Sequence, residues 1–181
     1  IAEESEQTLG IDLQHRAGKW SLRYSYLDRV QRVFGDDNPN RTLARWDLDA
    51  HLFNVAHPLG PGTLSGYAYL LDNQSLPATS QSTLGLRYAL RRERKDALGW
   101  FLNAEAAHQD NYAGGSALID AGYFLFEGGL LWRGNAFKAG WEHLGGDGHY
   151  GFSTPLATLH AFNGWADRFL ATPVDGLEDR Y

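Results

Sequence analysis

The feature that most constrains the fold is a period-two alternation of apolar and polar residues that returns in segment after segment. Successive side chains of a β-strand point to opposite faces, so strict alternation predicts a half-buried strand and not a helix. In the stretch 19–26, Trp20, Leu22, Tyr24 and Tyr26 alternate with polar residues. Each such segment therefore predicts a strand with one apolar and one polar face.

The alternation predicts an all-β chain that forms one unit, residues 1–181. Eight strands are expected, at 7–15, 18–33, 43–56, 62–72, 81–93, 97–109, 118–133 and 135–144. Residues 176–181 read as the start of a ninth strand.

The predicted links alternate between short and long along the chain. Those after the first, third, fifth and seventh strands are brief, as at Ala17-Gly18, Asp96 and Gly134-Asn135. Those after the second, fourth, sixth and eighth are longer, as at 36–40. Short turns at one end and long loops at the other are typical of antiparallel up-and-down transmembrane barrels.

Composition narrows the function classes. Apolar residues make up 43% of the chain and are scattered, so no stretch is long enough for a membrane-spanning helix. The net charge of −6, without a cluster of Lys and Arg, argues against binding nucleic acid. Cysteine is absent, which excludes disulfides and thiolate metal sites.

The last link contains a segment that does not alternate. Apolar residues recur there at intervals of three and four, Thr154 is a suitable N-cap, and Pro155 suits a first helical turn. We expect a short helix near 154–169 inside this loop. It either folds into the barrel as a gate or packs over its mouth, and the candidate gate residues are Thr154, Pro155, Leu159, Phe162 and Trp165.

Three stretches have a characteristic sequence: Gly145-Gly146-Asp147-Gly148 followed by residues 151–170, which is the most specific, and the shorter stretches 32–37 and 65–72. In these stretches the chain resembles the alginate-export family of outer-membrane porins. The resemblance implies an outer-membrane β-barrel with more strands than this chain holds, of which the chain is a fragment. It also implies passive passage of a polar or anionic solute, such as the polysaccharide alginate, across a bacterial outer membrane.

The polar side of the strands supplies the candidate pore-lining residues. They carry both signs of charge, so they are expected either to pair across strands or to contact solute. They are Arg23, Arg45, Asp47, Asp49, His51, Arg87, Arg91, Glu105, Glu127, Arg133, Lys138 and Glu142. An exporter of a polyanion is expected to be richer in arginine than this mixed set.

Other chemistry has little support in the sequence. His143, Asp147, His149 and His160 match no metal-ligand spacing, so loop polarity explains them and no metal or cofactor is expected. Ser153 lies in no nucleophile-elbow pattern, so no catalytic residue and no enzyme activity are expected.

Two other kinds of β-barrel would show the same alternation of apolar and polar residues. A soluble lipocalin-like barrel turns its apolar face inward around an apolar ligand, and a structural barrel has a filled, non-conducting interior. The porin hypothesis instead predicts that the large aromatic residues face the lipid bilayer, or form a track on which sugars stack. The residues expected on the lipid side are Trp20, Trp46, Trp100, Phe124, Phe126 and Trp132.

Overall fold

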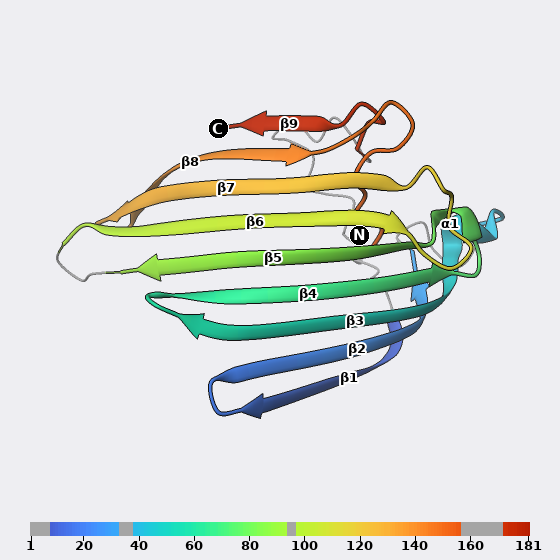
Figure 1. The fold of residues 1–181 in the computed structure, drawn as a ribbon, viewed down its shortest axis with the longest axis horizontal. Helices are drawn as coiled ribbons and strands as arrows, with labels where there is room; N and C mark the ends of the chain where they lie inside the picture. Colours follow the sequence, from blue (N-terminus) through green and yellow to red (C-terminus); the bar gives the residue numbers. More distant parts are fainter. Residues whose placement is uncertain (1–7, 33–37, 94–96, 157–171) are drawn as a thin grey trace.

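The computed structural model describes residues 8–32, 38–93, 97–156 and 172–181, and in these the chain forms one antiparallel sheet (Figure 1). The nine strands are β1 (Thr8–Ala17), β2 (Trp20–Gln31), β3 (Arg45–Leu59), β4 (Gly62–Asn73), β5 (Gln81–Arg92), β6 (Gly99–Asn111), β7 (Asp120–Trp132), β8 (Asn135–Leu144) and β9 (Leu177–Arg180). Each strand pairs with its neighbours in sequence, which is an up-and-down meander. The all-β antiparallel prediction is confirmed.

Three of the four links predicted to be short are two-residue turns, whereas the link between Arg92 and Gly99 is nearly as long as the one between Asn73 and Gln81. The turns 18–19, 60–61 and 133–134 lie at one end of the sheet, and the long links lie at the other (Figure 1). Arg133 and Gly134 both have positive φ, at 47° and 80°, as a type I′ hairpin turn requires. Two short helical pieces were not predicted: α1 (Arg41–Ala44), capped by the Asn40 side chain, and η1 (Pro77–Thr79).

The described sheet is open, since β1 pairs only with β2 and β9 only with β8 among these residues. Barrel closure is therefore not seen in the described part of the chain. In the same ranges, no helix has the length and apolar character needed to cross a membrane.

Strand register divides the side chains into two faces. One, here called the charged face, carries Arg23, Arg87 and Glu105. Arg23 pairs with Asn54 of β3, on the same side as Ala56, and Ala56 pairs in turn with Ser65, Ser65 with Arg87, and Arg87 with Glu105. The other, here called the aromatic face, carries Phe53, Phe124 and most other large exposed apolar side chains.

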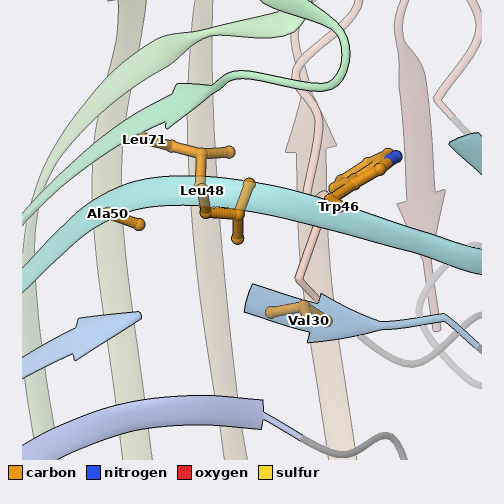
Figure 2. Packing of buried hydrophobic residues seen from close by; sticks show 5 residues of the cluster. All are labelled: Val30, Trp46, Leu48, Ala50 and Leu71. Atoms are coloured by element: carbon orange, nitrogen blue, oxygen red, sulfur yellow. The ribbon is translucent and has the colours of Figure 1, made fainter. Parts of the chain in front are cut away.

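The buried core lies on the charged face, at its long-loop end. One cluster joins Val30 of β2, Trp46, Leu48 and Ala50 of β3, and Leu71 of β4 (Figure 2). Trp46 is 8% exposed and its Nε1–H donates to the Thr42 carbonyl at 2.9 Å. The prediction that Trp46 faces lipid is therefore wrong, because β3 is apolar on this face where it meets the loops.

Glycines allow rings to lie flat over neighbouring strands of the charged face. The Tyr67 ring crosses Gly85 of β5 so closely that a Cβ added at Gly85 would lie 2.0 Å from Tyr67 Cζ. The Tyr181 ring covers Gly140 of β8 in the same way, with a closest approach of 2.7 Å. Ring and glycine thus form a packing unit in which any larger residue forces the ring to move.

We expect Gly85→Ala to destabilise the protein by about 1–3 kcal/mol, because the added methyl must displace the Tyr67 ring. The measurement is the midpoint of urea-induced unfolding. Gly66→Ala is the matched control on β4, since a Cβ there meets Val55 at an ordinary 3.5 Å. Equal midpoints for the two variants would contradict this account of the packing.

Candidate solute trough on the charged face

The middle of the charged face is hollowed into a trough of about 610 Å³. Strands β3 to β8 form its floor and walls, and residues 152–156 cover part of it. The side chains used below are Asn54, Tyr67, Tyr69, Arg87, Glu105 and Glu142. They come from five strands, so only the register of the whole sheet brings them together.

The Tyr67 side chain connects three strands across the trough floor. Its hydroxyl reaches beyond Gly85 and donates to Glu105 Oε1 on β6 at 2.7 Å. The other Glu105 oxygen lies 3.8 Å from Arg87 Nε. Tyr69 leans the other way and donates to Asn54 Oδ1 on β3 at 2.9 Å. The two tyrosines thus cover the centre of the trough with aromatic surface.

Two further carboxylates of the charged face, Glu142 and Glu127, also have donors. The Tyr123 hydroxyl donates to Glu142 at 2.8 Å. Glu127 accepts from Lys138 Nζ at 3.1 Å, from Asn103 at 3.1 Å and from the Tyr181 hydroxyl at 2.9 Å. A carboxylate with several donors keeps a fixed orientation and loses little when water is removed. Tyrosine hydroxyls therefore supply much of this stabilisation.

A second group of charges lies on β1 and β2. Arg23 Nε donates to Asp12 at 2.9 Å, and the Ser25 hydroxyl donates to the same oxygen at 2.8 Å. Both ionic side chains are 40% exposed or more, so the pair adds little to stability. Its main effect is to neutralise the Arg23 charge at this edge of the face.

Residues 145–156, here called the strap, cross the charged face at its long-loop end. Phe152 stacks on Tyr123 with ring centroids 5.2 Å apart, and it belongs to the buried cluster of β6 to β8. Leu156 packs against the cluster around Leu48 at the other side of the face. The strap therefore bridges the two buried clusters and covers the end of the trough.

Two buried glutamines hold the strap. Gln109 of β6, 1% exposed, accepts from the Ser153 backbone N–H at 2.8 Å and donates to the Ser153 carbonyl at 2.6 Å. The Tyr150 hydroxyl lies 2.6 Å from Gln81 Oε1 of β5, and burial raises the pKa of Tyr150 above its ordinary value. Asp147 forms the turn before it, and backbone N–H groups of Tyr150 and His149 lower its pKa.

The structure brings together about half of the predicted pore-lining residues. Those on the charged face are Arg23, Arg87, Arg91, Glu105, Glu127, Lys138 and Glu142. Arg133 is in the β7–β8 turn, with its guanidinium 4.8 Å from the Trp132 ring.

The four predicted residues of β3 lie on the opposite face. Tyr26 of β2 pairs with His51, so His51, Asp49, Asp47 and Arg45 are on the aromatic side. The expectation that they share a face with Arg23 is wrong. Alternation within β3 separates its polar residues from its apolar residues correctly. In this half of the strand, however, the apolar residues point to the charged face, where they fill the core, so the polar residues lie on the aromatic face.

The predicted loop gate falls mostly outside the described residues. Leu159, Phe162 and Trp165 belong to 157–171, which the described ranges do not include. Thr154 and Pro155 are described, and both line the trough. The chain turns at Pro155 and Leu156.

Sequence reasoning missed the tyrosines and glutamines of this site. Tyr67 and Tyr69 alternate with Gly66 and Ala68, so both sides of β4 look weakly apolar and the strand alone does not indicate which side faces the trough. Gln81 and Gln109 are ordinary polar positions in the sequence. Their role appears only once the strap is placed against them.

Among the described residues, no group of three or more His, Asp or Glu side chains is arranged to hold a metal ion. Comparison of the chain with protein-family models, curated proteins and solved structures found no match.

Gln109→Ala is expected to loosen the strap, because it leaves the Ser153 N–H and carbonyl without their partner at a cost of about 1–3 kcal/mol. Limited proteolysis within 145–156 should become faster. Gln14→Ala is the control, since it removes only an exposed 3.2 Å bond to Asp12. Unchanged cleavage in Gln109→Ala would show that the strap is held by other contacts.

Proposed function

We propose that this chain forms the wall of a bacterial outer-membrane β-barrel that passes a polar solute by passive diffusion. In this proposal the charged face borders water and the aromatic face borders lipid. The observation that carries it is the exposure of the aromatic face, where Leu84 is 69% exposed, Phe137 64% and Phe126 55%. Soluble monomers seldom expose a continuous apolar surface of more than a few hundred Å².

The height of the apolar surface supports a membrane setting. On β7 the aromatic face carries Phe124, Phe126, Leu130 and Trp132 in succession, from near the long loops to the short turn. The span from Phe124 to Trp132 is about 26 Å at 3.3 Å per residue. Outer-membrane barrels have an apolar band about 25 Å tall. At the tilt of about 35–45° that barrel strands have, this length rises about 20 Å along the membrane normal, which covers most of the height of such a band.

The ends of the aromatic face also fit a bilayer. Trp20, Trp100 and Trp132 lie close to the short turns, where tryptophan favours the membrane interface. Charged side chains appear on this face near the long loops, as with the facing pair Asp110 and Asp120. The aromatic rim beside the apolar band is the counterpart of one of the two aromatic girdles that flank the band of a barrel wall.

One observation favours a second candidate, a barrel that binds an apolar ligand. The aromatic face has a hollow of about 980 Å³ whose lining includes Leu13, Phe53, Leu84 and Phe124. An acyl chain or another apolar molecule fits such a surface. The two candidates differ in whether bulk lipid or a single ligand covers the aromatic face.

Tryptophan quenching in vesicles tests the proposal. In variants that keep one tryptophan each, we expect brominated lipids to quench Trp100 and Trp132 strongly. Trp46 is the matched control, because it is buried on the charged face and should be quenched little. Equal quenching of all three would contradict the assignment of faces.

Conductance separates the proposal from the alternatives. The protein reconstituted into a planar bilayer should give discrete single-channel steps. Lipid quenching without conductance would support a structural barrel instead. A monodisperse protein without detergent that binds a fluorescent fatty acid would favour the apolar-ligand candidate.

A further inference from the structure

The aromatic floor of the trough is the feature that points to a particular solute. The Tyr67 ring starts on β4, crosses Gly85 on β5 and ends at Glu105 on β6. A ring that spans three strands in this way lies along the sheet, with one side against the backbone and the other toward the trough. The Tyr69 ring is stacked against it with an offset, with centroids 4.9 Å apart and planes 25° from parallel. Together the two rings form a stepped aromatic surface, here called the platform.

The charges of the trough disfavour an anionic solute. Its described lining holds one cationic side chain, Arg87, and two carboxylates, Glu105 and Glu142. Arg87 Nε already lies 3.8 Å from Glu105. A polyanion would therefore displace Arg87 from its carboxylate and approach Glu142 as well, and both changes oppose binding.

The polar groups around the platform suit hydroxyl groups. Arg87 and Asn54 provide N–H donors, while Glu105 and Glu142 provide acceptor oxygens. A hydroxyl group both donates and accepts, so a solute with several hydroxyls uses both kinds of partner. The volume of about 610 Å³ is within the range of small-molecule sites, which is about 300–1,000 Å³.

We infer that the trough binds an uncharged, hydroxyl-rich ring compound, a neutral sugar unit, stacked on Tyr67 and Tyr69. Neutral sugar rings combine an apolar C–H side with peripheral hydroxyls, which is the combination that the platform and its polar rim match. The inference rests on the proposed function only for how the solute reaches the trough. Binding itself is measurable on the protein in detergent.

Calorimetric titration with maltotriose, a neutral trisaccharide, tests binding, and a trimer of galacturonic acid is the anionic comparison. We expect maltotriose to bind more tightly than the anionic trimer. Tyr69→Ala should weaken maltotriose binding about tenfold, since it removes half of the platform. Tyr69→Phe keeps the ring and should bind nearly as well as the unchanged protein. Tyr26→Ala, on the aromatic face, is the control and should leave binding unchanged.

The outcomes separate this inference from the proposed function. Tighter binding of the galacturonate trimer, or no binding of maltotriose, would overturn the inference while single-channel conductance still supports the conduit. Conversely, maltotriose binding that depends on the Tyr69 ring, in a protein without conductance, would support the inference and contradict the conduit. Equal binding by Tyr69→Ala and Tyr69→Phe would also overturn it, because the ring would then have no part in binding.

Discussion

The antiparallel hydrogen-bond ladder is the constraint on which the rest of this structure depends. Each pair of strands fixes which side chains share a face, and a slip by one residue would exchange the two faces. Because β4, β5 and β6 are in continuous register from Thr63 to Asn111, Tyr67, Arg87 and Glu105 are held on one surface. The trough, its ion pairs and its aromatic floor all follow from that alignment. The aromatic face follows from the same alignment, since it is the other side of the same ladder.

Tyrosine, glycine and glutamate form a repeated unit on the charged face. In one copy Tyr67 of β4 crosses Gly85 and donates to Glu105, and in the other Tyr181 crosses Gly140 of β8 and donates to Glu127. The glycine removes the side chain that would lift the ring, and the glutamate accepts the hydroxyl two strands away. A polar face in a twisted sheet can thus satisfy its carboxylates with donors from its own aromatic residues.

Most of the fold was predictable from the sequence, because the alternation of apolar and polar residues identifies each strand and separates its two faces. All eight predicted strands and the beginning of the ninth are present, and their ends differ by a few residues. The relation between strands was not predictable from any one of them. In β3 the sequence separates Asp47 from Leu48 correctly, yet it does not reveal that Leu48 rather than Asp47 shares the side of Arg23. Likewise Gln109 resembles any surface glutamine until the strap, 44 residues later in sequence at Ser153, is placed on it.

The strap also has a consequence for the order of folding. Its binding groups, Gln81 and Gln109, are on adjacent strands, and they become diagonal neighbours on the charged face only after β5 and β6 have paired. Its two ends pack on clusters built from strands that lie far apart in the sheet. Contacts of such long sequence separation form late, since the intervening chain must be ordered first. The strap is therefore expected to dock last, when the hairpins beneath it are complete.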